Sequence, residues 1–230
     1  MAGAVGIDKG RCVVAVLAIA AGVGAALGPG PAAAVPERMR PSPTEAASFR
    51  PPPKPTGRLL VVKGNPKPSG PGAPIRFMVE IEQGLRADGA AFAAAVQQVL
   101  YDDRSWGGGS VAFRRVDSEP VSFRVALASP DTTDRLCAPL QTVGIYSCHQ
   151  SGRAVLNSMR WHKGAASYRN NLLGYRRYLV NHEVGHALGS YHRSCPVAGA
   201  RAPVMMQQTK GVAPCRPGPW PSEAERQGIY

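Results

Sequence analysis

The chain has 230 residues, a formal net charge of +12 at pH 7 and five cysteines, which bounds it to one folded domain with extensions or two very small domains. The excess of 27 basic over 15 acidic residues suits anionic partners such as cell-wall polymers. The basic residues are scattered and no nucleic-acid-binding motif accompanies them, so the composition argues against a nucleic-acid-binding protein.

The N-terminal segment has the pattern of an export signal. Lys9 and Arg11 precede an apolar run, Cys12–Leu27, and small residues follow up to Ala34. This order predicts a signal peptide over residues 1–34. Because the apolar run approaches the length that spans a bilayer, an uncleaved anchor is the alternative. Either reading places the rest of the chain outside the cell, with membrane contact only through this segment.

A proline-rich linker is predicted over residues 35–57. Of the 22 prolines, 13 lie between Pro29 and Pro74, and Pro36–Thr56 lacks a set of large apolar residues. Such a segment has no core of its own and forms a semi-extended tether. It is interpreted as a wall-spanning linker or a propeptide, and the folded domain is expected over residues 58–230.

The domain itself alternates strand and helix patterns. Expected strands lie at Leu59–Val62, Ile75–Ile81, Val111–Val116, Val121–Ala128 and Arg153–Trp161. A first helix is predicted from an Asp88 cap to Tyr101, with a disulfide-held loop over residues 130–150. The order predicts an α+β fold in which a small twisted sheet packs on two helices.

A second, centrally buried helix is predicted to begin at Asn170 or Asn171. Gly174 and Gly185 each cost this helix about 1 kcal/mol relative to alanine. They are therefore expected where another element, a strand by preference, approaches the helix closely.

Four cysteines remain once Cys12 is assigned to the export signal. An even number in an exported chain implies two disulfides, for which three pairings are possible. Sequential pairing is the most economical. Cys137–Cys148 would close the loop before the second helix, and Cys195–Cys215 would bracket Pro203–Met206.

The second helix carries a histidine motif with the spacing of a zinc site. Residues 182–192 read His-Glu-Val-Gly-His-Ala-Leu-Gly-Ser-Tyr-His. Residues four apart share a helix face, so His182 and His186 can bind one ion. Gly189 permits a positive-φ exit that returns His192 to the same ion. Three neutral imidazoles and a water predict one catalytic Zn²⁺.

Glu183 stands beside the first ligand, where its carboxylate can reach a metal-bound water without binding the metal. Zinc lowers the pKa of its water toward about 7, so Glu183 can accept the proton and return it to the leaving amine. The predicted function is a secreted zinc-dependent endopeptidase acting on a peptide or protein substrate, with Glu183 as the general base.

The motif resembles the zinc signature of the metzincin metalloproteases. The resemblance implies a methionine turn beneath the metal, for which Met205 is the first candidate and Met206 the alternate. The sequence of residues 57–221 also resembles a group of secreted actinobacterial domains of unknown function with a metzincin-like core. Two positions depart from well-studied metzincins: Arg193 follows the third histidine, and Gln207 stands where some members have a tyrosine ligand.

Two other functions compete with the endopeptidase. One is a zinc amidase that cleaves cell-wall peptides, and the other is a non-catalytic, zinc-stabilised wall-binding module. Glu183 argues against the second, because a structural metal site needs no base. His149 and His162 lie outside the motif. Either could contact substrate, but a solvated or hydrogen-bonded role is the preferred expectation for each.

Overall fold

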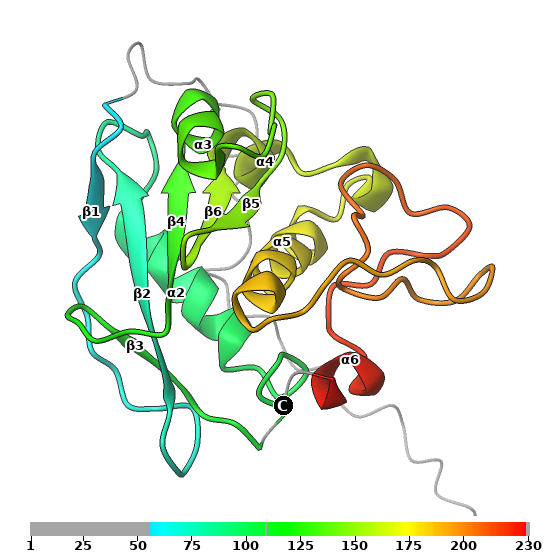
Figure 1. The fold of residues 1–230 in the computed structure, drawn as a ribbon, viewed down its shortest axis with the longest axis horizontal. Helices are drawn as coiled ribbons and strands as arrows, with labels where there is room; N and C mark the ends of the chain where they lie inside the picture. The colour runs from blue at the N-terminus through cyan, green and yellow to red at the C-terminus, as the bar shows by residue number, and fades with distance from the viewer. Residues whose placement is uncertain (1–55, 109, 229–230) are drawn as a thin grey trace, which may run out of the picture. The chain divides into compact units, whose positions relative to one another are not determined.

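A mixed six-stranded sheet forms the centre of the fold in the computed structural model, which describes residues 56–108 and 110–228 (Figure 1). The strand order is β1-β2-β4-β6-β5, and β3 also pairs with β2. The strands β2, β3, β4 and β6 are parallel, whereas β1 and β5 join antiparallel. Their bounds are β1 Leu59–Val61, β2 Ile75–Glu82, β3 Phe113–Val116, β4 Phe123–Ala128, β5 Cys148–Gln150 and β6 Arg153–Asn157. The predicted α+β class is confirmed, and β5 is an edge strand.

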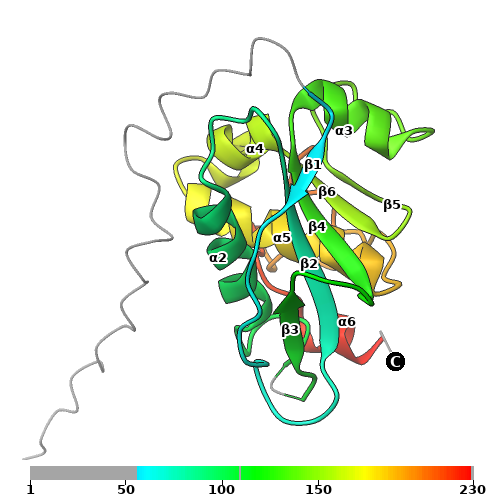
Figure 2. The same ribbon diagram turned by 90° about the vertical axis from the view of Figure 1, so that its left-hand side faces the viewer.

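One face of the sheet packs on the two helices that the sequence predicted, α2 (Gly89–Leu100) and α5 (Leu172–Ala187) (Figure 2). Alternate strand residues point to this face because successive side chains in a strand alternate. Phe77 of β2 lies in register with Phe123 of β4, and their rings stack with centroids 5.7 Å apart. The largest apolar core therefore lies between the sheet and these helices.

The expectation of a loop over residues 130–150 is wrong in part, because two regular elements form there. Helix α3 (Pro130–Cys137) begins directly after Ser129, whose side chain accepts a hydrogen bond from Thr132 N. A loop then connects α3 to β5. A proline at the first helical position needs no hydrogen-bond donor. Cys137 packs with Cys148 and Val155 in a small cluster on the opposite face of the sheet.

The strand expected over Arg153–Trp161 ends at Asn157. The Asn157 side chain accepts a hydrogen bond from Met159 N at 3.0 Å and starts α4 (Ser158–Lys163). An asparagine that caps a helix stops the strand before it. A 3₁₀ turn, Ala166–Tyr168, then leads to Asn171, which caps α5 as one of the two predicted residues.

A buried carboxylate fixes the start of the described chain against α3. The Glu82 side chain, 1% exposed, accepts hydrogen bonds from Ser129 N at 2.6 Å, Thr132 Oγ1 at 2.8 Å and Gly57 N at 2.9 Å. Burial alone would raise the pKa of Glu82, but these hydrogen bonds outweigh burial and lower it. The carboxylate is therefore held as an anion.

Both predicted disulfides, Cys137–Cys148 and Cys195–Cys215, are formed, which indicates maturation in an oxidising, extracellular environment. The predicted signal segment and nearly all of the linker, residues 1–55, lie outside the described residues. Among the described helices, none has the length and apolar character to span a bilayer.

Candidate metal centre

Helix α5 delivers two histidines to one side and then turns the chain back with a third. The helix ends in two capping hydrogen bonds, from Ser190 N to Gly185 O at 2.9 Å and from Gly189 N to His186 O at 3.0 Å. This pair of bonds is a Schellman motif, which requires a left-handed residue at Gly189; its φ is 90°. The chain then reverses and places His192 beside His186.

The three predicted ligands converge. One ligand atom from each of His182, His186 and His192 lies within 4.8 Å of the others, and the Nε2 atoms of His186 and His192 are 3.1 Å apart. Two imidazole nitrogens bound tetrahedrally to one zinc lie about 3.3 Å apart, given zinc–nitrogen bonds of about 2.0 Å. The triad therefore fits a metal ion of this size.

Backbone carbonyls set the tautomers that metal binding needs. His182 Nδ1 lies 2.8 Å from Val204 O, and His186 Nδ1 lies 2.8 Å from Ser190 O. A carbonyl only accepts, so each Nδ1 carries the proton and each Nε2 keeps its lone pair for a metal. Burial lowers the pKa of His182 to about 3 and also lowers the pKa values of His186 and His192. All three side chains are therefore neutral at pH 7.

Glu183 lies next to the triad and is only 4% exposed. Its carboxylate has no hydrogen bond or ion pair to any of the described residues, and burial raises its pKa to about 8. The side chain lines the cleft, and its oxygens are not among the inaccessible polar atoms without a partner, but partial removal from water still disfavours the charged form. Such a group can hold or release a proton near neutral pH.

Met205 lies beneath the helix, completely buried, whereas Met206 is half-buried. A methyl group on Gly185 would overlap Sδ of Met205 and ring carbon Cζ2 of Trp106. The expectation that a strand approaches these two glycines is therefore wrong. The side chains of Met205 and Trp106 approach Gly185, and the capping side chain of Asn171 approaches Gly174. Gly185 lets Met205 lie directly under the metal-binding turn of α5.

Two buried polar side chains hold the segment Pro203–Gln208 in place. Glu225 of α6 (Glu223–Gln227), 2% exposed, accepts hydrogen bonds from Met205 N at 2.9 Å and Val204 N at 3.2 Å. The Gln208 amide donates to Pro203 O at 2.9 Å and to Gly218 O at 2.8 Å. Because Val204 O accepts a hydrogen bond from the His182 ring, these contacts hold the group that orients His182, the first of the three metal ligands.

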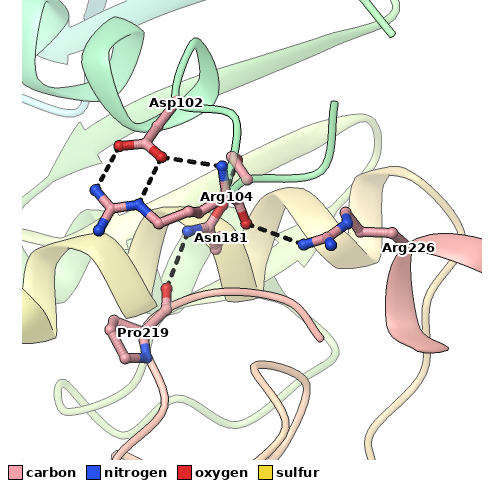
Figure 3. A network of polar contacts seen from close by, with 6 residues as sticks. Asp102, Arg104, Asn181, Pro219 and Arg226 are labelled. Carbon is pink, nitrogen blue, oxygen red and sulfur yellow. Dashed lines mark hydrogen bonds and ion pairs between the residues drawn. The ribbon is translucent and has the colours of Figure 1, made fainter. Parts of the chain in front are cut away.

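Asn181 anchors α5 one residue before the first ligand. Its amide accepts from Ser105 Oγ at 2.7 Å and donates to Pro219 O at 3.0 Å. Figure 3 shows the second of these bonds beside the Asp102–Arg104 pair, with Arg226 donating to the Arg104 carbonyl. Asn181 thereby connects the segment after α2, helix α5 and the C-terminal segment.

An open cleft of about 450 Å³ lies above the triad. Its lining residues come from the disulfide-held loop and β5, from α5, and from the turns after it: Leu140, Gln141, Thr142, Tyr146, Ser147, Cys148, His149, Tyr178, His182, Glu183, His186, Gly189, Ser190, Tyr191, His192, Gln207, Thr209 and Lys210. The site is therefore open to a ligand from solvent on the side of the edge strand.

The two histidines outside the motif differ. His162 is buried, and its Nδ1 lies 2.8 Å from Ser158 O, so the expected hydrogen bond is present. His149 lines the cleft, and its inaccessible Nε2 has no hydrogen-bond partner among the described residues, so the preferred expectation of a solvated or hydrogen-bonded ring is wrong for this atom. The sequence left substrate contact as the less favoured alternative for His149, because nothing local to β5 indicates which face lies near α5.

Comparison with known proteins identifies a family but no characterised relative. The family model DUF3152, described as a protein of unknown function, matches residues 52–216. No curated protein and no solved structure matches the chain. The matched segment contains the triad, Glu183 and Met205, and it ends before Glu225.

Proposed function

We propose that the chain, which belongs to the DUF3152 family, is a secreted zinc-dependent endopeptidase with a metzincin-like site. The observation that carries the proposal is a histidine triad, two of whose members have their tautomers set by backbone carbonyls, beside a buried carboxylate. This carboxylate has no hydrogen bond or ion pair among the described residues, and it lies in an open cleft with the triad. A purely structural metal site would need neither the free carboxylate nor the open cleft.

His182, His186 and His192 would hold the zinc through Nε2, the nitrogen that their surroundings leave free in the first two. Bound zinc supplies a Lewis acid for the scissile carbonyl and makes water available as a nucleophile at neutral pH. Its positive charge also favours the ionised form of Glu183, opposing the effect of burial.

Glu183 then moves the proton. Its carboxylate oxygen accepts a proton from the attacking water and donates it to the nitrogen of the leaving amine. Because the side chain makes no other hydrogen bond among the described residues, neither transfer requires breaking an existing contact. A pKa that burial raises toward neutrality suits both directions of transfer.

The edge strand β5 provides a means to align a substrate. It borders the cleft through Cys148 and His149 and pairs only with β6 among the described strands. An extended peptide can add to such an edge by backbone hydrogen bonds. The antiparallel edge strand, the Gly189 turn and the buried Met205 together support the metzincin-like reading.

Cleavage of a mixed peptide library tests the proposal. Zinc-loaded wild-type protein is compared with Glu183→Ala, and zinc content is measured for both. We expect products from wild type alone, with about one zinc per chain in each protein. Equal cleavage by the two proteins would refute Glu183 as the base. No products from either, with zinc retained, would favour the non-catalytic wall-binding module.

A further inference from the structure

The cleft over the triad carries an unbalanced charge. Among its described lining residues, only Glu183 at the floor and Lys210 at the rim have side chains of the aspartate, glutamate, lysine or arginine type. The remaining residues are apolar, hydroxyl-bearing, amide-bearing or histidine. A ligand entering the cleft therefore meets one fixed ammonium group and no acidic rim residue.

The Lys210 ammonium has no acidic partner in the part of the chain that the structure describes. Within the described residues, no carboxylate lies at ion-pair distance from it. Its Nζ instead donates to Gln207 Oε1 at 3.2 Å and lies 5.3 Å from the ring centroid of Tyr146. Tyr146 belongs to the disulfide-held loop, so these contacts join the two loops that border the cleft.

The backbone beneath Lys210 is fixed. Lys210 N donates to Gln207 O at 3.0 Å in a tight turn. Of the two residues before it, Gln208 is fully buried and Thr209 Oγ1 lies 3.0 Å from the Tyr175 hydroxyl. A lysine on a fixed turn loses less freedom when it binds an anion than one on a mobile loop.

Lys210 shares the cleft with the metal centre. The same cleft is lined by Lys210, by His182, His186 and His192, and by Glu183. Lys210 is not one of the grouped metal ligands. A substrate group held by Lys210 would accordingly lie in the cleft that contains the bond to be cleaved.

We propose that Lys210 binds a carboxylate of the substrate, so that the site selects carboxylate-bearing peptides. The carboxylate comes from an acidic side chain or from the free C-terminus close to the scissile bond. This inference rests on the proposed function, because it names the substrate class of the same cleft. It also predicts discrimination against substrates with a basic side chain at that position.

The test uses one cleaved peptide in matched forms: with Glu or Gln at each position flanking the scissile bond, and with a C-terminal acid or amide. Values of kcat/KM are measured for zinc-loaded wild type, Lys210→Gln, Lys210→Glu and the control Lys163→Gln. Lys163 is an exposed residue at the end of α4 and does not line the cleft. Zinc affinity is measured for every protein.

Wild type and Lys163→Gln should cleave the carboxylate form about fivefold faster than its neutral match, the size of a partly exposed ion pair. Lys210→Gln should bring this ratio near one, and Lys210→Glu should invert it, with zinc affinity unchanged. The Glu/Gln pairs and the acid/amide pair identify the source of the carboxylate. Equal ratios in wild type and Lys210→Gln would overturn the inference.

Binding separates this inference from the proposed function. The same peptides are titrated into zinc-loaded Glu183→Gln protein, with and without Lys210→Gln. If wild type cleaves nothing but the carboxylate form binds more tightly through Lys210, the carboxylate site stands and the peptidase proposal fails. If both forms bind equally, the inference fails whatever the result for cleavage.

Discussion

Glu225 offers a sharp test of how the metal centre is held, because it touches no ligand directly. Its carboxylate accepts four hydrogen bonds: from Met205 N, from Val204 N, and from the backbone and hydroxyl of Ser222. In Glu225→Gln the most favourable amide orientation keeps the oxygen on Val204 and Ser222. The amide nitrogen then faces Met205 N, and two donors oppose each other in a buried place.

The expected cost follows from these contacts. One buried unsatisfied donor costs about 1–3 kcal/mol, and the remaining bonds lose the contribution of the charge. We expect a total of about 3 kcal/mol, which lowers Tm by roughly 6–12 °C in a domain of this size. Because Val204 O orients His182, zinc affinity should also fall about 10- to 100-fold.

The assay is competition for zinc with a chromophoric chelator, paired with thermal unfolding with and without zinc. Ser222→Ala is the matched control. It removes the hydroxyl that caps α6 at Glu225 N, 3.2 Å away, and that donates to the Glu225 carboxylate at 2.9 Å. This costs about 1 kcal/mol but leaves the carboxylate's bonds to Val204 and Met205. Glu225→Gln protein that unfolds earlier yet binds zinc within twofold of wild type would refute the reasoning, as would an equal loss in Ser222→Ala.

Three other perturbations test the structure. Hydrogen bonds lower the pKa of Glu82 below its ordinary value of 4.5, so the stability that this carboxylate contributes is present above pH 4.5 and is lost as the pH falls through the lower folded value. As the pH is lowered from 7 to 3, the urea midpoint of Glu82→Gln should therefore fall less steeply than that of wild type, and parallel curves would contradict this. Gly185→Ala should destabilise by about 1–3 kcal/mol despite its better helix propensity, because the methyl group overlaps Met205; a raised Tm would count against the close contact. Replacing Cys195 and Cys215 by serine should lower the free energy of unfolding by about 3 kcal/mol, given their 20-residue separation. The same variant should lose zinc to a chelator faster than wild type, and unchanged zinc retention would show that the bridge does not support the site.

The histidine triad was predictable because its geometry is local. Helical spacing puts His182 and His186 on one face, and Gly189 supplies the turn that the third ligand needs. All three ligands lie within eleven residues, so no knowledge of distant contacts is required. The sequential disulfides were similarly accessible, since short separations favour those pairings.

Helix α3 shows where the reading of local signals fell short. Ser129, Pro130 and Asp131 form a helix start in the sequence, with a cap, a proline at the first position and an acid in the first turn. The apolar periodicity that marks a helix is weak in this segment, because α3 covers only the small cluster around Cys137 and Val155. A loop was therefore the natural expectation from periodicity.

Residues that act over long sequence distances could not be foreseen. Ser222 and Glu225 have the spacing of a capping box, which the structure contains. Nothing in that spacing says that the same carboxylate also binds backbone amides 20 and 21 residues earlier. The position of Lys210 at the cleft likewise depends on buried contacts of Gln208 and Thr209 with distant parts of the fold.

The dependence of Val204 on Glu225 sets an order of assembly. A polypeptide emerges from the ribosome, or from an export channel, with its N-terminal part first, so the three histidines precede the carboxylate that fixes the loop beneath them. A chain caught before Glu225 has emerged carries every metal ligand but not the support of His182. The support of His182 therefore forms late. Cleavage between Cys215 and α6 would separate Glu225 from the covalent chain that carries the triad, without removing a single ligand.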